Sequence, residues 1–138
     1  MDLWHPTLET KFHIDRDWWK GQRRNLRLHI HSRLCASCKA LYPTYEDAGE
    51  MDWVDEQTAE VTRVDALWHI VRTCCSTKPE YITDETPLAE AIFRIFLANG
   101  NTPLTPMELY QIFNRRPPGV ILRTLTGEQI YYGIKPIL

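Results

Sequence analysis

The sequence predicts a mainly helical protein with short strands, of the α+β class, built from two parts that pack on each other. Three observations lead to this prediction. Residues 1–80 contain all four cysteines, in a spacing that is typical of a metal-binding knuckle. Residues 81–138 contain helix-capping patterns followed by apolar residues at helical spacing. Short runs in which polar and apolar residues alternate lie near both ends of the chain and predict strands.

The N-terminal part begins with a predicted strand at residues 11–15, where apolar and polar residues alternate. Asp17 is then expected to cap a long helix. The apolar stripe of that helix contains Trp19, Leu26, Ile30 and Leu34. Residues 26–30 also alternate, so a strand is the competing prediction for this stretch.

Residues 42–57 are expected to form an irregular acidic loop. Thr62 followed by Asp65 resembles a capping box and predicts the start of a helix that ends near Cys75. Residues 76–85 then form a linker, and we place the boundary between the two parts there, at residue 80.

The C-terminal part contains the clearest helix signals of the chain. One helix is expected to begin at Thr86 and to end at Gly100. Thr105 and Glu108 have the spacing of a full capping box, with proline at the first helical position of a second helix. Residues 119–126 predict a third helix.

These three helices and a predicted strand at residues 129–134 resemble a helix-turn-helix unit of the winged-helix kind. The third helix of that family enters the major groove of DNA. The resemblance implies that Arg115, Arg116 and Arg123 are cationic contacts to nucleic acid. The predicted third helix has few polar side chains with which to read bases, and only one strand follows it. Docking of another protein is therefore the alternative role for this unit.

The cysteine pattern predicts a zinc site. Cys35 and Cys38 form a C-x-x-C pair, which is half of a tetrahedral site, and a second group follows after about 35 residues. That group consists of His69, Cys74 and Cys75. The site would be either C-x2-C-x30-H-x4-C or four cysteines, and both alternatives need the helix to end near Arg72. The competing interpretation is that the cysteines are small buried apolar residues.

Charge is distributed unevenly along the chain. Residues 16–39 contain seven basic side chains and one acid, whereas residues 42–60 contain seven acids and no base. The basic segment is a second candidate for nucleic-acid binding, with Trp18 and Trp19 available for stacking. Its candidate phosphate contacts are Arg23, Arg24 and Arg27. The alternative is that these arginines neutralise the acidic segment.

An enzyme is the less favoured hypothesis. The chain contains no nucleophile elbow, P-loop, dinucleotide-binding glycine pattern or H-E-x-x-H motif. The residues that a metal-dependent enzyme would use are His13, Asp15, His29 and His31.

The chain has no signal-peptide pattern at its start and no apolar run long enough to cross a membrane, which predicts a cytoplasmic protein that keeps its thiols reduced. We therefore expect a small cytoplasmic binding protein with a structural zinc. Its expected partner is nucleic acid in transcriptional regulation, or another protein of which it is a docking subunit.

Overall fold

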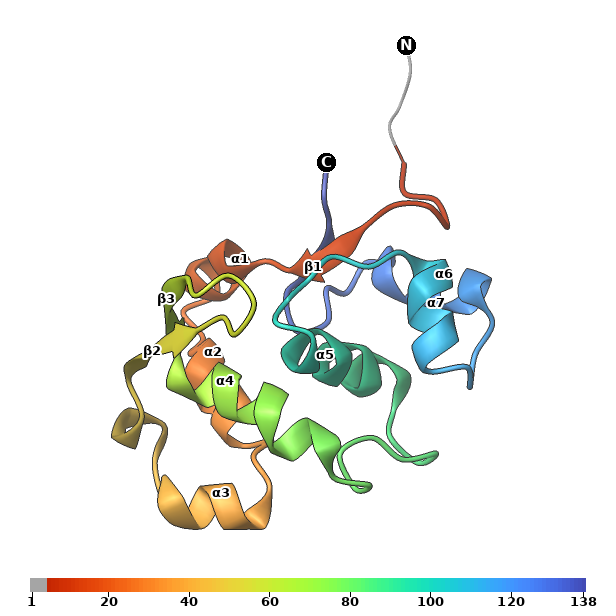
Figure 1. The fold of residues 1–138 in the computed structure, drawn as a ribbon. Helices are drawn as coiled ribbons and strands as arrows, with labels where there is room; N and C mark the ends of the chain where they lie inside the picture. The colour runs from red at the N-terminus through yellow and green to blue at the C-terminus, as the bar shows by residue number, and fades with distance from the viewer. Residues whose placement is uncertain (1–4) are drawn as a thin grey trace.

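The computed structural model describes residues 5–138 and has the α+β fold shown in Figure 1. Short helices form most of the regular secondary structure, and two small sheets lie beside them. The α-helices are α1 (Arg16–Gly21), α2 (Leu26–His31), α3 (Ala36–Leu41), α4 (Ala66–Thr73), α5 (Leu88–Ala98), α6 (Pro106–Ile112) and α7 (Pro118–Leu125). The strands are β1 (Phe12–Ile14), β2 (Glu50–Val54), β3 (Val61–Asp65) and β4 (Ile134–Pro136), and the 3-10 helices are η1 (Tyr45–Asp47) and η2 (Cys75–Thr77).

Each sheet consists of two antiparallel strands. β1 pairs with β4, with Ile14 opposite Ile134, so the two ends of the described chain meet in one ladder. β2 pairs with β3 as a hairpin, with Met51 opposite Val64. The first sheet joins the predicted N-terminal and C-terminal parts directly.

The long helix predicted after Asp17 is wrong, because the chain breaks it into α1, α2 and α3. Asp15, not Asp17, caps α1. After Gly21 the backbone turns through Arg23, which has a positive φ of 54°. Asn25 then caps α2 by accepting a hydrogen bond from the Leu28 amide. Glycine and asparagine favour such a break, and they outweigh the apolar spacing.

The predicted acidic loop and the predicted helix start at Thr62 are also wrong. Part of the loop forms β2, and Thr62 lies in β3, where it pairs with Trp53. The helix begins after Asp65, whose side chain accepts hydrogen bonds from the Leu67 and Trp68 amides. Thr62 has a β-branched side chain, which favours a strand, and its pairing with β2 fixes this extended conformation.

The C-terminal helices form as predicted, with small shifts at their ends. α5 ends at Ala98, with Asn99 as its C-cap residue and Gly100 at a positive φ of 71°. Thr105 and Glu108 form the complete capping box of α6. The final strand is shorter and later than residues 129–134 and pairs with β1. The winged-helix arrangement itself is not confirmed.

One hydrophobic core runs through both predicted parts. Phe12, Trp19 and Ile30 from the N-terminal side belong to the same cluster of buried residues as Phe93 and Ile121 from the C-terminal side. The boundary at residue 80 stays a prediction.

Candidate functional site

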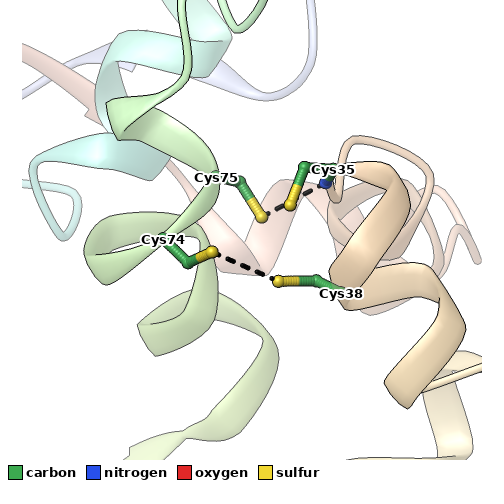
Figure 2. A group of neighbouring side chains, drawn as sticks. All are labelled: Cys35, Cys38, Cys74 and Cys75. Atoms are coloured by element: carbon green, nitrogen blue, oxygen red, sulfur yellow. Dashed lines mark hydrogen bonds between the residues drawn. The ribbon is translucent and has the colours of Figure 1, made fainter.

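The four cysteines lie together where the start of α3 meets the end of α4 (Figure 2). Cys35 is the N-cap residue of α3, and Cys38 lies in the first turn of that helix. Cys74 directly follows α4 and has non-helical backbone angles, and Cys75 begins η2. Because α4 ends at Thr73, two adjacent cysteines can point toward the same centre, as the sequence required.

The sulfur positions are compatible with one bound metal ion. All four Sγ atoms lie within 4.8 Å of one another. Sulfurs bound at about 2.3 Å around a tetrahedral ion stand about 3.8 Å apart. The Sγ atoms of Cys38 and Cys74 are already 3.5 Å apart, so small side-chain rotations suffice to close the site.

Polar groups around the cluster also suit thiolates. The backbone amide of Cys35 donates a hydrogen bond to the Cys75 Sγ at 3.2 Å. The Ser37 hydroxyl lies 3.3 Å from the Cys35 Sγ. Hydrogen bonds of this kind orient ligands and stabilise their charge.

The pKa values of the thiols differ strongly within the cluster. The Ser37 hydroxyl and the Cys38 amide lower the pKa of Cys35 to about 6. Burial is the main cause that raises the pKa of Cys38 and of Cys75. A bound cation would reverse this effect, since metal coordination keeps thiols deprotonated.

His69 is not part of this group. Its ring lies 6.2 Å from that of Trp53, and it lines a pocket beside β3 and α4. Five residues along a helix rotate a side chain by about 140° beyond a full turn, so His69 and Cys74 diverge while α4 stays regular up to Thr73. The structure brings together the four-cysteine set, which was one of the two alternatives.

A closed set of four thiolates leaves no coordination position for water or substrate. Such a site holds segments together and does not perform hydrolysis. Within residues 5–138, no further group of three or more His, Cys, Asp or Glu side chains is arranged to hold a metal.

The residues of the rival enzyme hypothesis are dispersed in structural roles. Asp15 caps α1, and His31 Nε2 lies 2.6 Å from the Tyr42 carbonyl oxygen. The His29 ring packs 4.8 Å from the Trp19 ring, and burial lowers its pKa. His13 lies in β1 opposite Lys135.

The predicted nucleic-acid contacts fall into three settings. Arg27 is half-buried and is fixed by an ion pair with Asp65 and by hydrogen bonds that it donates to the Tyr45 and Ala48 carbonyl oxygens. Arg115 pairs with Asp84 on the surface. The remaining four are exposed and have no acidic partner within the described chain: Arg23, Arg24, Arg116 and Arg123.

The sequence did not predict a pocket of about 370 Å³ that Arg27 helps to line. Its lining includes Arg16, Trp53, Trp68 and Arg72, which come from α1, β2 and α4. These positions are far apart in the sequence, so no local spacing links them. The hairpin that contains Trp53 was predicted as an irregular acidic loop.

Comparisons with protein-family models, curated proteins and solved structures found no match to this chain. Across residues 5–138, no helix is both long and apolar enough to cross a membrane.

Proposed function

We propose that this protein is a non-enzymatic, cytoplasmic nucleic-acid-binding protein that holds one structural Zn²⁺. The observation that carries the proposal is the convergence of four Sγ atoms within 4.8 Å. Four soft sulfur ligands in tetrahedral arrangement favour zinc or iron, and a single closed site without a substrate position is typical of structural zinc.

The zinc would connect two segments that lie far apart in the sequence, Cys35–Cys38 and Cys74–Cys75. α3 lies at one edge of the molecule in Figure 1, and the cluster is where its N-terminal turn meets the end of α4. A metal at this point fixes α3 to the core, which is the usual role of a zinc knuckle.

The surface charge supports nucleic acid as the partner. Exposed arginines without acidic partners remain on the α1–α2 side and around α7. Phosphate binding needs such cations, because those already paired with carboxylates gain little from a phosphate. A role in transcriptional regulation follows from the helix-turn-helix resemblance of α5–α7 and is part of the proposal.

Protein docking is the second candidate. The exposed side of α6 presents Met107 and Ile112, the latter 57% exposed. A docking surface on α7 would expose Val120 and Tyr131. Both side chains are half-buried, so they are partly accessible to a partner. The apolar exposure on α6 is small and scattered, so it supports docking less than the unpaired arginines support nucleic acid.

Metal analysis tests the zinc half of the proposal. Protein purified without chelators should contain one equivalent of zinc, measured by mass spectrometry of the metal content. Replacing both Cys35 and Cys38 by serine should remove it, because only two ligands remain. His69→Gln is the matched control and should keep the zinc. Iron in place of zinc, no stoichiometric metal, or loss of metal in His69→Gln would contradict the four-cysteine zinc site.

Equilibrium titration tests the binding half. The zinc-loaded protein should bind nucleic acid with an affinity that falls steeply with salt, because each neutralised phosphate releases counterions. An absence of salt-sensitive binding to both duplex and single-stranded probes would leave protein docking as the function.

A further inference from the structure

We propose that the basic groove beside α1 and α2 binds single-stranded nucleic acid, with one unstacked base in the adjoining pocket against Trp53. We define the basic groove by Arg16, Lys20, Arg23 and Arg24. The inference rests on the proposed nucleic-acid function and names the surface and the kind of strand.

The basic groove is a depression of about 450 Å³ that only cationic, apolar and amide side chains line. Its four defining cations have no acidic partner among residues 5–138. The fifth cation on its wall, Arg27, is neutralised by Asp65. Four unpaired positive charges along one depression make a path for a phosphate backbone.

The groove adjoins the pocket of about 370 Å³. The two hollows share Arg16, Leu26 and Arg27 as their common wall. Inside the pocket, Arg63 is paired with Glu50 and Asp52. Arg72 also lines the pocket, lies against Gly100 and has no acidic partner in the described chain, so it adds a second unpaired cation there beside Arg16.

The pocket also contains two tryptophan rings, and an accessible ring can stack on a base. The face of Trp68 is covered by the Arg16 guanidinium at 4.9 Å, and its indole nitrogen donates to the Leu97 carbonyl oxygen. Trp53 is half-buried, and among the described residues the aromatic ring next to it is that of His69, at 6.2 Å. Trp53 is therefore the ring available for stacking on a base, whereas Trp19 is 2% exposed and is not.

Unpaired cations beside an accessible indole ring favour a single-stranded nucleic acid over a duplex or an acidic peptide. Ligand pockets begin at roughly 300 Å³, so this one has room for a base, but a base inside a duplex cannot enter it. An acidic peptide would use the cations and leave the indole unused. In Figure 1, α7 lies at the opposite side of the molecule from α1 and α2, so the two surfaces can be tested separately.

The test uses the full-length, zinc-loaded protein and three fluorescein-labelled probes: a 15-nucleotide oligo-dT, a 15-nucleotide oligo-U and a 15-base-pair duplex. Both single strands should bind more tightly than the duplex. The slope of log affinity against log salt should be about −3, because each phosphate contact to a single strand contributes about −0.7.

A set of substitutions locates the site. Replacing both Arg23 and Arg24 by alanine should weaken binding of the single strands at least tenfold and reduce the salt slope by about half. Trp53→Ala should weaken binding about tenfold with an unchanged slope, and Trp53→Phe should restore most of it. Replacing both Lys11 and Lys39 by alanine removes two exposed charges outside both arginine surfaces and is the matched control, which should have no effect. Replacing both Arg116 and Arg123 by alanine tests the α7 side separately. Zinc content and circular dichroism verify that each variant is folded.

The outcomes separate this inference from the proposed function. Binding that prefers the duplex and is lost only in the Arg116 and Arg123 variant overturns the groove and keeps the nucleic-acid function. Absence of binding to all three probes overturns both. Equal competition by polyglutamate, together with unchanged affinity in Trp53→Ala, identifies an acidic-protein surface and also overturns the inference.

Discussion

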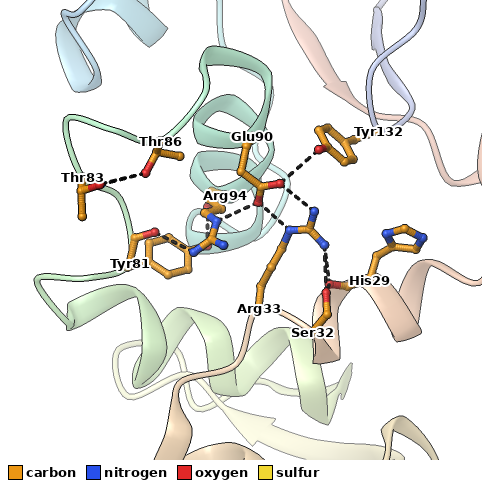
Figure 3. A network of polar contacts seen from close by, with 9 residues as sticks. All are labelled: His29, Ser32, Arg33, Tyr81, Thr83, Thr86, Glu90, Arg94 and Tyr132. Atoms are coloured by element: carbon orange, nitrogen blue, oxygen red, sulfur yellow. Dashed lines mark hydrogen bonds and ion pairs between the residues drawn. The ribbon is translucent and has the colours of Figure 1, made fainter.

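Glu90 lies at the centre of a polar network that includes side chains from both predicted parts (Figure 3). Its carboxylate accepts hydrogen bonds from Arg33 and Arg94 at 2.6 to 2.8 Å and from the Tyr132 hydroxyl at 3.1 Å. Burial disfavours the charged carboxylate, but the two guanidinium groups outweigh it and lower the pKa of Glu90 to about 2. The Arg33 guanidinium also lies 4.7 Å from the centre of the Phe93 ring.

Glu90→Gln should therefore destabilise the protein by about 3 kcal/mol at neutral pH, because it leaves two guanidinium groups without their counter-charge. The folded pKa lies below the ordinary value of 4.5, so the stabilisation is complete above that value and is lost as the pH falls toward 2. Urea unfolding of both proteins from pH 7 to pH 2.5 measures this. Glu80→Gln, at an exposed site, should be neutral. A difference between Glu90→Gln and wild type that stayed constant with pH would contradict this role.

Residue types alone predicted half of the cysteine cluster and left the rest open. The C-x-x-C spacing is local, so Cys35 and Cys38 could be paired from the sequence. Choosing Cys74 and Cys75 over His69 required the end of α4 at Thr73, which no local signal marks. Trp53 could not be associated with Arg16 at all, because the β2–β3 hairpin that places it was not predicted.

Single elements were predictable where the signal was local and complete. The Thr105 and Glu108 side chains each accept the hydrogen bond that the capping-box spacing predicts, at 3.1 and 3.0 Å. The similar spacing of Thr62 and Asp65 predicted a helix start at Thr62, which is wrong. Thr62 pairs with β2 as part of a strand, and Asp65 caps the helix instead. Tertiary pairing overrides a capping pattern when a partner strand is near.

Thr105→Ala should destabilise the protein by about 1 kcal/mol, because one orphan amide of the first turn of α6 loses its acceptor. Chemical unfolding measures the free energy, and hydrogen exchange at the Glu108 amide should become faster. The control is Met107→Ala on the same helix, which changes an exposed side chain and adds a good helix former. A neutral Thr105→Ala, or an equal loss in both variants, would show that the cap contributes nothing.

At the scale of the whole molecule, the two predicted parts are tied together by β1 pairing with β4 and by one hydrophobic core. Local patterns could indicate helices and strands on either side of residue 80. They could not reveal that Phe12 and Ile134, over a hundred residues apart, are both almost fully buried in the same cluster. This long-range burial decides whether the parts unfold together.

We expect unfolding to be one cooperative transition that includes the cysteine cluster. Ile134→Ala removes a side chain that is 1% exposed and should destabilise the protein by about 2–5 kcal/mol. Although Ile134 is distant from the cysteines in the chain, zinc release should shift to lower temperature by the same amount as the loss of tryptophan fluorescence, because the same core supports both. Ile137→Ala, at a side chain that is 40% exposed, should shift neither. Zinc release that stays at its wild-type temperature in Ile134→Ala would mean that residues 1–80 and 81–138 unfold as separate domains.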